Sequence, residues 1–455
     1  MIKTVILAAG EGTRMKSKIT KVLHPVCGKS LVKHVIDAVD IEEVVEKIVI
    51  LGKNREMVEP ELKNQDLVFR TQPFGEGAPY GTGFAVMQAL DLIEDEDLVL
   101  IVCGDTPLLR QETIRGFIKY HQENQMDATV LTTELDNPFG YGRIVRDSGE
   151  KVTAIVEEKD ADQEIKQIKE INSGIFIIQG GSLKSSLKKI DNNNSQNEYY
   201  LTDVIQIMSK EAYKVGGYKI ADSKEINGIN NRMQLAEAEA ILRERINQEH
   251  MTNGVTFIDP SHTYIDASVK IGADTVIEAN VQLKGNTIIG SDCFIGANTK
   301  IVDSKIADGV SIENSVIVES QVGSHTTVGP FAYLRPQSVV GEHIKIGDFV
   351  EIKNATIGDG TKVPHLSYVG DAEVGERCNI GCGVIFCNYD GAKKHKTIVG
   401  NHVFVGSNSN LVAPVELEDE AFIAAGSTIT NKVENGDLAI ARAKQVNKKG
   451  WRKKD

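Results

Sequence analysis

The chain has 455 residues and a formal net charge of −13 at pH 7. Its length suggests two or three domains, and its acidity argues against nucleic acid or an anionic membrane surface as a partner. The apolar run at the N-terminus is too short for a signal peptide and no run reaches transmembrane length, so we expect a cytoplasmic protein whose six cysteines are reduced thiols.

The first predicted strand, residues 3–7, runs into a loop of small residues, 8–15 (AAGEGTRM). Such a loop lets backbone N–H groups approach phosphates, and Arg14 adds further donors. A dinucleotide-binding loop would have a third glycine in place of Met15, which makes a Rossmann cofactor site the weaker alternative. A second predicted strand, residues 98–102, leads into Asp105, a carboxylate placed to hold Mg²⁺.

The string LAAGEGTRM followed by Lys21 resembles the signature of sugar-phosphate nucleotidylyltransferases. Five later segments match this family in order: 139–144 (FGYGRI), 156–159 (VEEK), 170–174 (EINSG), 198–203 (EYYLTD) and 228–232 (GINNR). The resemblance implies an α/β, Rossmann-like nucleotidyltransferase domain over residues 1–229, with Asp105 and Asn230 as ligands of Mg²⁺. The implied nucleotide- and sugar-binding residues are Leu7, Ala8, Ala9, Gly10, Gly12, Arg14, Lys21, Gln72, Gly81, Thr82, Cys103, Gly104, Asp105, Gly142, Glu157, Asn172 and Asn230.

Two features depart from that family. The spacer between Gln72 and Gly81 is longer than the family's and rich in glycine and proline, which leaves base selectivity open. Thr20 stands where the family usually has a proline before Lys21, so we expect this lysine to be presented less rigidly.

The pattern changes after residue 230. Strong helix formers up to residue 250, followed by Asn253 and Gly254, predict a linker helix over residues 230–251. From Ile265 to Ile429 an aliphatic residue then returns at nearly every sixth position, often followed by glycine and with a few slips of register. A helix cannot keep a period of six on one face, and a strand alternates with a period of two. One short strand and one turn per hexad therefore fit best.

This repeat resembles the left-handed parallel β-helix of hexapeptide acyltransferases. The resemblance implies a flat-sided prism over residues 252–437 that associates as a homotrimer. A basic C-terminal arm, residues 438–455, would then either fold over a site on the prism or fray.

Three basic residues break the small or acidic pattern after the inward aliphatic: Lys284, Arg335 and Lys353. Arg335 and Lys353 lie three hexads apart, hence one coil apart if three hexads make a turn, which predicts a cationic pocket suited to a phosphate. Lys284 alone is equally explained as a solvated charge. His365, a coil further on, is the candidate base for an amine that attacks a thioester.

The hexad register is interrupted after Phe386 by residues 388–396 (NYDGAKKHK). Insertions in solenoids collect on a functional face, although a solvated loop is the alternative. With this loop and the segments 335–336 (RP), 365–368 (HLSY), 379–381 (NIG) and 405–407 (VGS), essentially the whole chain resembles one family. It is that of the bifunctional N-acetylglucosamine-1-phosphate uridylyltransferases and glucosamine-1-phosphate N-acetyltransferases.

That resemblance implies two reactions: acetyl transfer from acetyl-CoA to glucosamine 1-phosphate with His365 as base, then Mg²⁺-dependent uridylyl transfer from UTP with release of pyrophosphate. The product, UDP-N-acetylglucosamine, would serve peptidoglycan and cell-wall synthesis. The implied sugar-phosphate ligands are Arg335, Lys353, Tyr368, Asn379 and Asn388. The implied acetyl-CoA residues, in sites completed by neighbouring subunits, are Cys382, Asn388, Tyr389, Ser407, Ala425 and Arg442.

Three alternatives remain open from the sequence. Cys382 would act through its backbone, but a role of its thiol as acyl carrier is the alternative. A nucleotidylyltransferase with an architectural or regulatory prism would explain the first 230 residues alone. A metal-dependent hexapeptide enzyme would need three converging histidines, and His343, His365 and His395 do not share a register slot.

Overall fold

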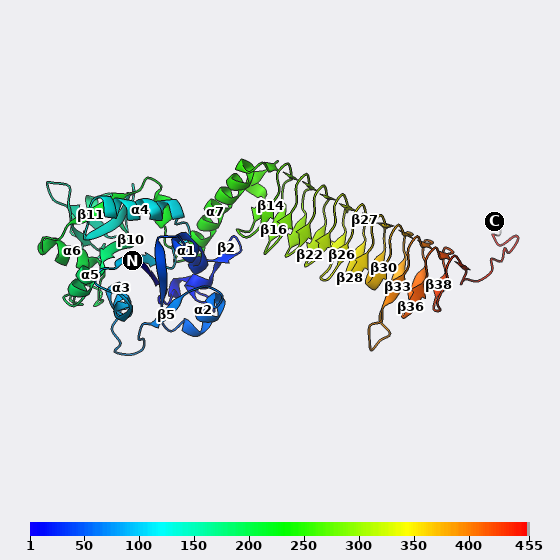
Figure 1. The fold of residues 1–455 in the computed structure, drawn as a ribbon, viewed down its shortest axis with the longest axis horizontal. Coiled ribbons are helices and arrows are strands. Elements are labelled where there is room, and N and C mark those ends of the chain that lie inside the picture. The colour runs from blue at the N-terminus through cyan, green and yellow to red at the C-terminus, as the bar shows by residue number, and fades with distance from the viewer. Residues whose placement is uncertain (453–455) are drawn as a thin grey trace. The chain divides into compact units, whose positions relative to one another are not determined.

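The computed structural model describes residues 1–452 and divides the chain into two compact units (Figure 1). The first unit comprises residues 1–242, and the second begins at Arg243. Helix α7 (Arg232–Thr252) spans this boundary. No helix in the described part of the chain is both long and apolar enough to cross a membrane.

The first unit is built on a mostly parallel sheet with the strand order β11-β7-β10-β6-β1-β4-β5. Parallel pairs join β1 to β4 and β6, β4 to β5, and β11 to β7, whereas β10 runs antiparallel to β6 and β7. A short antiparallel pair, β8 and β9, is attached through β10. The strand bounds are β1 (Ile2–Leu7), β4 (Val44–Leu51), β5 (Val68–Thr71), β6 (Leu98–Cys103), β7 (Ala128–Glu134), β8 (Arg143–Arg146), β9 (Val152–Val156), β10 (Glu170–Gln179) and β11 (Val215–Lys219).

Helices cover both faces of this sheet, which explains why its central strands are nearly continuous aliphatic runs. On one face, Ile6, Val49 and Val102 pack with residues of α1 (Leu31–Val39), α2 (Arg55–Leu62) and α4 (Gln111–Glu123). On the other face, Val5, Ile48 and Ile101 pack with residues of α3 (Thr82–Met87), α5 (Gly180–Leu187) and α6 (Thr202–Lys210).

The second unit is a prism of short parallel strands from β12 (Thr256–Phe257) to β39 (Leu438–Ala439) (Figure 1). Each strand pairs with a strand about three hexads further along; Ile271, for example, is the register partner of Ile289. Ile277, Leu283 and Ile295 point into the core and are fully buried. The expected left-handed parallel β-helix with three hexads per coil is confirmed.

The glycine that often follows the inward-pointing aliphatic residue is explained by the close approach of neighbouring coils. A Cβ on Gly272 would lie 2.6 Å from the carbonyl carbon of Gly290 in the next coil. Small hydroxyl residues are buried at many of the turns, and Thr326 donates from its hydroxyl to Gly341 O at 2.9 Å. A hydroxyl placed in this way satisfies a backbone carbonyl where the strands turn.

The strands that carry the second candidate site are β25 (Tyr333–Leu334), β27 (Lys345–Asp348), β28 (Glu351–Ile357), β29 (Lys362–His365), β30 (Tyr368–Val374), β31 (Asn379–Ile380), β32 (Ile385–Cys387), β33 (Thr397–Val399) and β34 (Phe404–Val405). Between β32 and β33 the insertion predicted at residues 388–396 leaves the prism as a projecting loop (Figure 1). The last described residues, 440–452, form no strand. Residues 453–455 of the expected basic arm lie outside the described part.

Candidate functional sites

The first candidate site forms where β1 and β6 end side by side. Leu7 pairs with Cys103 in the parallel register, and Gly104 donates its N–H to Leu7 O at 2.9 Å. Both loops that follow therefore emerge at the same edge of the sheet, which is where α/β sheets bind ligands. The loop after β1 contains the predicted residues 8–12, and the loop after β6 contains Asp105.

Four predicted side chains meet at this edge. Lys21 Nζ lies 2.5 Å from Asp105 Oδ2 and 3.2 Å from Asn230 Oδ1. Arg14 donates from Nη2 to the same Asn230 oxygen at 3.0 Å. The carboxylate of Asp105 and the amide oxygen of Asn230 thus both contact the ammonium of Lys21. Such hard oxygen donors suit Mg²⁺, so the donor set fits the metal ion that the sequence implies.

Asn230 is held in place by its own segment. Ile229 donates its N–H to Asp105 O at 2.9 Å, and the backbone N–H of Asn230 donates to Gln234 Oε1 at 2.8 Å. The loop after β6 and the residues that precede α7 are therefore bonded to each other. This contact explains how positions so distant in sequence share one site.

Lys21 is presented by a tightly packed turn. Thr20 has φ −64°, the value that a proline would impose, and its hydroxyl accepts a hydrogen bond from Asn54 Nδ2 at 3.2 Å. Gly12 has a left-handed φ of 62°, and a Cβ there would lie 2.5 Å from Lys21 Cβ. The absence of proline therefore does not loosen Lys21 as the sequence suggested, because Asn54 holds the turn instead.

The long spacer after β5 forms a loop that projects from the unit between β5 and α3 (Figure 1). Gln72 at its start is buried and donates its N–H to Leu51 O, whereas Phe74 and Tyr80 are exposed. At its end Gly81 has φ 124° and packs against the backbone of Tyr199. Thr82 follows and accepts a hydrogen bond from the N–H of Leu201 at 3.1 Å. The extra residues are therefore accommodated without displacing Gln72 from the buried part of the fold.

The three predicted sugar ligands come together through strand pairing. Gly142 precedes β8 and Glu157 follows β9, and the antiparallel register of these strands places the two residues side by side. A Cβ on Gly142 would lie 3.4 Å from the Glu157 carboxylate, and Asn172 donates its N–H to Gly142 O at 2.9 Å. Thr202, for which the sequence predicted no role, donates its hydroxyl to Glu157 Oε1 at 3.2 Å.

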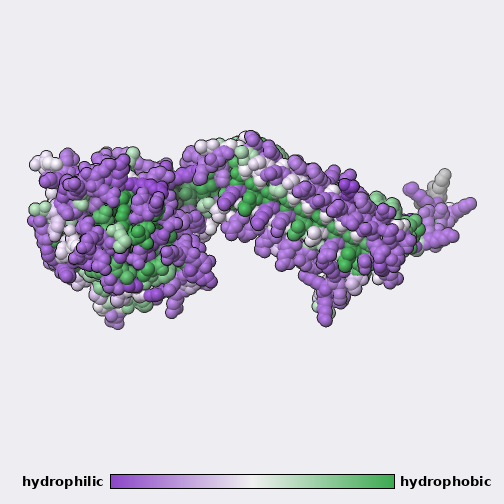
Figure 2. All heavy atoms as spheres, viewed as in Figure 1, coloured by the Kyte–Doolittle hydropathy of each residue, from purple (hydrophilic) through white to green (hydrophobic). Residues whose placement is uncertain are grey.

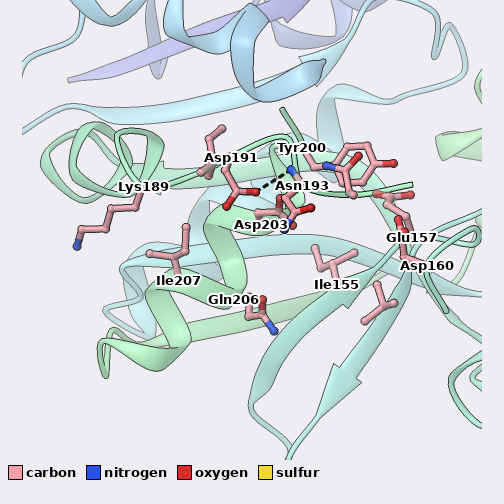
Figure 3. Close-up of a pocket in the computed structure, with 13 residues that line it drawn as sticks. Ile155, Glu157, Asp160, Lys189, Asp191, Asn193, Tyr200, Asp203, Gln206 and Ile207 are labelled. Carbon is pink, nitrogen blue, oxygen red and sulfur yellow. Dashed lines mark hydrogen bonds between the residues drawn. The ribbon is translucent and has the colours of Figure 1, made fainter. Parts of the chain in front are cut away.

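Glu157 also lines a pocket of about 400 Å³ that Figure 3 shows in close-up. Asp160, Asp191 and Asp203 lie around the same pocket. Burial raises the pKa of Glu157, and burial together with these neighbouring carboxylates raises the pKa of Asp203 to about 6. The pocket is thus acidic, although Lys189 lies at its rim.

The thiol of Cys103 is hydrogen-bonded and unreactive. Its thiol donates to Gly174 O at 3.7 Å, and burial raises the pKa of this thiol to about 12. At neutral pH the group is a neutral thiol. We therefore expect Cys103 to contribute to nucleotide binding through its backbone and not through its thiol.

The second candidate site begins with the stacked basic pair. Leu334 pairs with Ile352, so Arg335 and Lys353 leave neighbouring coils at the same position. Arg335 donates to Glu351 Oε1 at 2.8 Å, and Lys353 Nζ lies 3.1 Å from both oxygens of Asp371. The predicted cationic pair is present, and each cation has an acidic partner that sequence reasoning missed.

Asp371 is the centre of this cluster. Besides Lys353, it accepts hydrogen bonds from Asn354 Nδ2 at 2.7 Å and Asn388 Nδ2 at 2.5 Å. Asn388 Nδ2 also lies 3.1 Å from Tyr368 Oη. The two hydrogen bonds from Asn354 and Lys353 hold the pKa of Asp371 below its usual range despite burial. Lys353, Tyr368 and Asn388 are therefore joined through one carboxylate.

A glycine makes room for this cluster. A Cβ on Gly370, the register partner of Lys353, would collide with Tyr368 Oη and lie 2.8 Å from Asn388 Nδ2. Only a residue without a side chain lets the phenol lie across the strand. Gly370 thus leaves room for Tyr368, and Asp371 after it accepts the hydrogen bonds of the cluster.

His365 lies at a corner of the prism with predicted acetyl-CoA residues. At this corner, the backbone N–H that follows the corner residue of one coil donates to the carbonyl oxygen of the corner residue one coil earlier. The four bonds run from Leu366 to Asp348, from Gly383 to His365, from Asn408 to Cys382 and from Gly426 to Ser407, so one corner residue is stacked per coil. The resulting corner ladder consists of Asp348, His365, Cys382, Ser407 and Ala425. Arg442 donates from Nη1 to Ala425 O at 2.6 Å and extends the ladder at its end.

Two predicted residues lie apart from these groups within the chain. Tyr389 is exposed on the projecting loop and donates from its hydroxyl to Gly391 O at 2.7 Å. Asn379 belongs to β31, where its register partners are Lys362 on β29 and Phe404 on β34, in the sheet that does not contain Asp371. Neither contacts the Asp371 cluster directly in the hydrogen bonds among the described residues.

The three histidines of the metal-enzyme alternative have different partners. His343 stacks on His325, His365 contacts Asp348, and His395 contacts Asp390. In the part of the chain that the structure describes, no three histidine, cysteine or carboxylate groups gather at one point.

The fold and these two clusters define a nucleotidyl transferase joined to a hexapeptide-repeat transferase. The family profile described as Nucleotidyl transferase matches residues 3–224, and that for bacterial transferase hexapeptide (six repeats) matches residues 268–303. The GMPPB C-terminal domain profile matches residues 319–449.

Curated relatives cover nearly the whole chain. "Bifunctional protein GlmU" of Clostridioides difficile (strain 630) is 52% identical over 450 residues, which is 99% of this chain and 97% of the relative. The proteins with the same name from Alkaliphilus metalliredigens (strain QYMF) and Clostridium novyi (strain NT) are each 51% identical, over 99% and 98% of this chain and 98% and 97% of their own length. The chain belongs to the family of bifunctional GlmU proteins, and it is an enzyme with uridylyltransferase and acetyltransferase activities.

Proposed function

We propose that the chain makes UDP-N-acetylglucosamine in two steps, acetylating glucosamine 1-phosphate in the prism and transferring a uridylyl group to the product in the first unit. The observation that carries this proposal is the presence of two separate clusters, one around Asp105 and one around Asp371 and His365. Each cluster has the groups that one of the two reactions requires.

For uridylyl transfer, Asp105 and Asn230 hold Mg²⁺, which neutralises phosphate charge when bound. Arg14 and Lys21 bind the phosphates from the same edge of the sheet, and both already lie within hydrogen-bond reach of Asn230. Gly142, Glu157 and Asn172 bind the sugar. Reaction of the sugar phosphate at the α-phosphorus of UTP needs alignment and charge neutralisation, and no protein nucleophile is required.

For acetyl transfer, Arg335 and Lys353 bind the phosphate of glucosamine 1-phosphate while Asp371 fixes Lys353, Asn388 and, through Asn388, Tyr368. The corner ladder receives acetyl-CoA, and His365 on that ladder takes the proton of the attacking amine. Cys382 takes part through its backbone, because the same amine can attack the thioester directly.

The sites of the prism are completed by other copies in a homotrimer. The position of Asn379 on another sheet supports this proposal, because within one chain it does not join the Asp371 cluster. Figure 2 shows hydrophobic residues along the visible side of the prism. Exposed apolar side chains recur on each of its faces: Ile288, Val339 and Ile398 on one, Val316 and Ile385 on a second, and Phe404 and Phe422 on the third. Exposed apolar side chains of this kind are a common feature of association surfaces. We place the enzyme in the cytoplasm, where its six cysteines would be reduced thiols.

The test is a coupled assay on the purified full chain. With glucosamine 1-phosphate, acetyl-CoA, UTP and Mg²⁺, we expect UDP-N-acetylglucosamine, with N-acetylglucosamine 1-phosphate accumulating when UTP or Mg²⁺ is left out. Pyrophosphate release from UTP without any thiol release from acetyl-CoA would support the alternative of a prism without catalytic activity.

A further inference from the structure

Strands β27 and β29 end at the same corner of the prism. Asp348 is the last residue of β27, His365 is the last of β29, and the two are register partners. The next residue in each case, Phe349 or Leu366, has a left-handed φ, 54° or 48°. The two strand ends therefore turn in the same way, and the side chains of Asp348 and His365 leave the prism together, one coil apart.

These side chains are in direct contact. His365 Nδ1 lies 2.5 Å from Asp348 Oδ1. The hydrogen bond from His365 holds the pKa of Asp348 below its usual range, so this carboxylate is ionised at neutral pH. An ionised carboxylate accepts hydrogen bonds and cannot donate them, so the proton of the contact belongs to Nδ1. In the neutral imidazole the lone pair is then on Nε2, the nitrogen away from Asp348.

Among the residues that the structure describes, two other histidines contact an aspartate, and both pairs differ from this one. Asp259 also accepts the N–H groups of Ser261 and His262, and Asp390 accepts those of Ala392 and Lys393. Both pairs are local and belong to turns that the aspartate stabilises. Asp348 instead contacts a histidine from another coil, and that histidine shares the corner ladder with Cys382 and Ser407.

We propose that Asp348 is a positioning residue for acetyl transfer, which holds the proton of His365 on Nδ1 so that Nε2 receives the proton of the substrate amine. The proposal rests on the proposed function of the prism. As the amine nitrogen bonds to the thioester carbonyl carbon, Nε2 takes its proton and the carbon–sulfur bond breaks. The proton passes on to the departing thiolate, and the Asp348 carboxylate stabilises the transient imidazolium.

Other charged and titratable groups face this pair. Lys345 on β27 acts on Asp348 through its positive charge, and Cys382 lies one coil beyond His365. Within one chain, both members are partly exposed, Asp348 by 37% and His365 by 52%. The contact therefore acts mainly by orienting the His365 imidazole and fixing its tautomer, because solvent screens the long-range effect of the Asp348 charge.

The experiment compares Asp348→Asn with the unaltered enzyme, using thiol release from acetyl-CoA with glucosamine 1-phosphate. We expect kcat to fall about tenfold or more, as part of the roughly 10²–10⁴-fold that a general base contributes. The KM for glucosamine 1-phosphate should stay unchanged, because the phosphate ligands lie elsewhere.

Two controls separate this role from a structural one. Asp259→Asn removes the carboxylate of another aspartate–histidine pair on the prism and should leave acetyl transfer unchanged. The uridylyl rate of Asp348→Asn should equal that of the unaltered enzyme. Asp348→Glu, which keeps the charge, should recover part of the lost kcat.

An unchanged kcat in Asp348→Asn, with thiol release lost in His365→Ala, would overturn this inference and leave the proposed function intact. An equal loss of kcat in Asp348→Asn and Asp259→Asn would also overturn it. Full thiol release in His365→Ala would overturn both.

Discussion

The ammonium of Lys21 lies 2.5 Å from the carboxylate of Asp105, although 84 residues separate them in the chain. The same ammonium lies 3.2 Å from Asn230 Oδ1. A lysine thus points between the two oxygens that we propose as metal ligands. If Mg²⁺ were held by these two oxygens, as we propose, Lys21 would be free to contact the phosphates, for which a lysine point charge is suited.

Asp105→Asn tests this relationship. The substitution keeps the shape of the side chain and removes the charge that holds Mg²⁺, so we expect pyrophosphate release to fall by about 10²-fold or more and to require more Mg²⁺. Thiol release should be unchanged. Asp91→Asn, which breaks an exposed ion pair with Arg70, is the matched control and should leave both rates intact. Normal Mg²⁺ dependence in Asp105→Asn would remove this residue from the metal site.

Asp371→Asn should weaken the sugar-phosphate site of the prism. Lys353, Asn354 and Asn388 all donate to this carboxylate, and a neutral amide cannot satisfy the three of them. A charged hydrogen bond contributes about 1.5–3 kcal/mol, so we expect the KM for glucosamine 1-phosphate to rise by roughly tenfold or more. Glu373→Gln, which removes the exposed partner of Lys396, should not change KM. Equal KM values for the two variants would contradict the central position of Asp371.

Gly81→Ala should damage the first unit alone. The φ of 124° is strained for alanine, and the new Cβ would collide with the backbone of Tyr199. We expect a lower melting temperature for the first unit and a reduced uridylyl rate, with acetyl transfer unchanged. Gly75→Ala has a similar φ of 112° but open space around it, so it separates strain from collision. The same loss in both variants would show that the contact with Tyr199 is unimportant.

Asp203 gives a pH-dependent prediction. Its pKa is raised from 3.8 to about 6, chiefly by burial, so ionising it in the folded protein costs stability. That cost is absent below pH 4, grows up to about pH 6 and is constant above. Asp203→Asn should therefore raise the melting temperature by roughly 2–4 °C at pH 8 and leave it unchanged at pH 4. The exposed Glu164→Gln should show no such difference, and an equal effect at both pH values would contradict the raised pKa.

The sequence predicted the architecture well because both units follow simple periodicities. Aliphatic runs before small-residue loops predicted the strands that end at the first site, and the period of six predicted the coils and the stacking of Arg335 on Lys353. Once three hexads make a coil, side chains at equal positions must stack. The family membership that the motifs suggested is confirmed by the relatives.

The partners of the predicted residues were harder to foresee. Asp371, Thr202 and Asn54 act through hydrogen bonds that depend on three-dimensional distance, and nothing in local spacing distinguishes them from other polar residues. Asp348 was within reach, because it lies 17 residues before His365, nearly one coil, and a register count would have placed the two together. The role of Thr20 was misjudged because the compensating Asn54 lies on another loop.

The central claim is that one chain carries two independent catalytic sites. The most direct measurement is UDP-N-acetylglucosamine formation from glucosamine 1-phosphate, acetyl-CoA and UTP by Asp105→Ala, by His365→Ala, and by the two variants mixed. We predict no nucleotide sugar from either variant alone, since Asp105→Ala stops at N-acetylglucosamine 1-phosphate and His365→Ala makes no acetylated sugar. The mixture should restore product through the released intermediate. Product from His365→Ala alone, or none from the mixture when each variant keeps its other activity, would contradict this account.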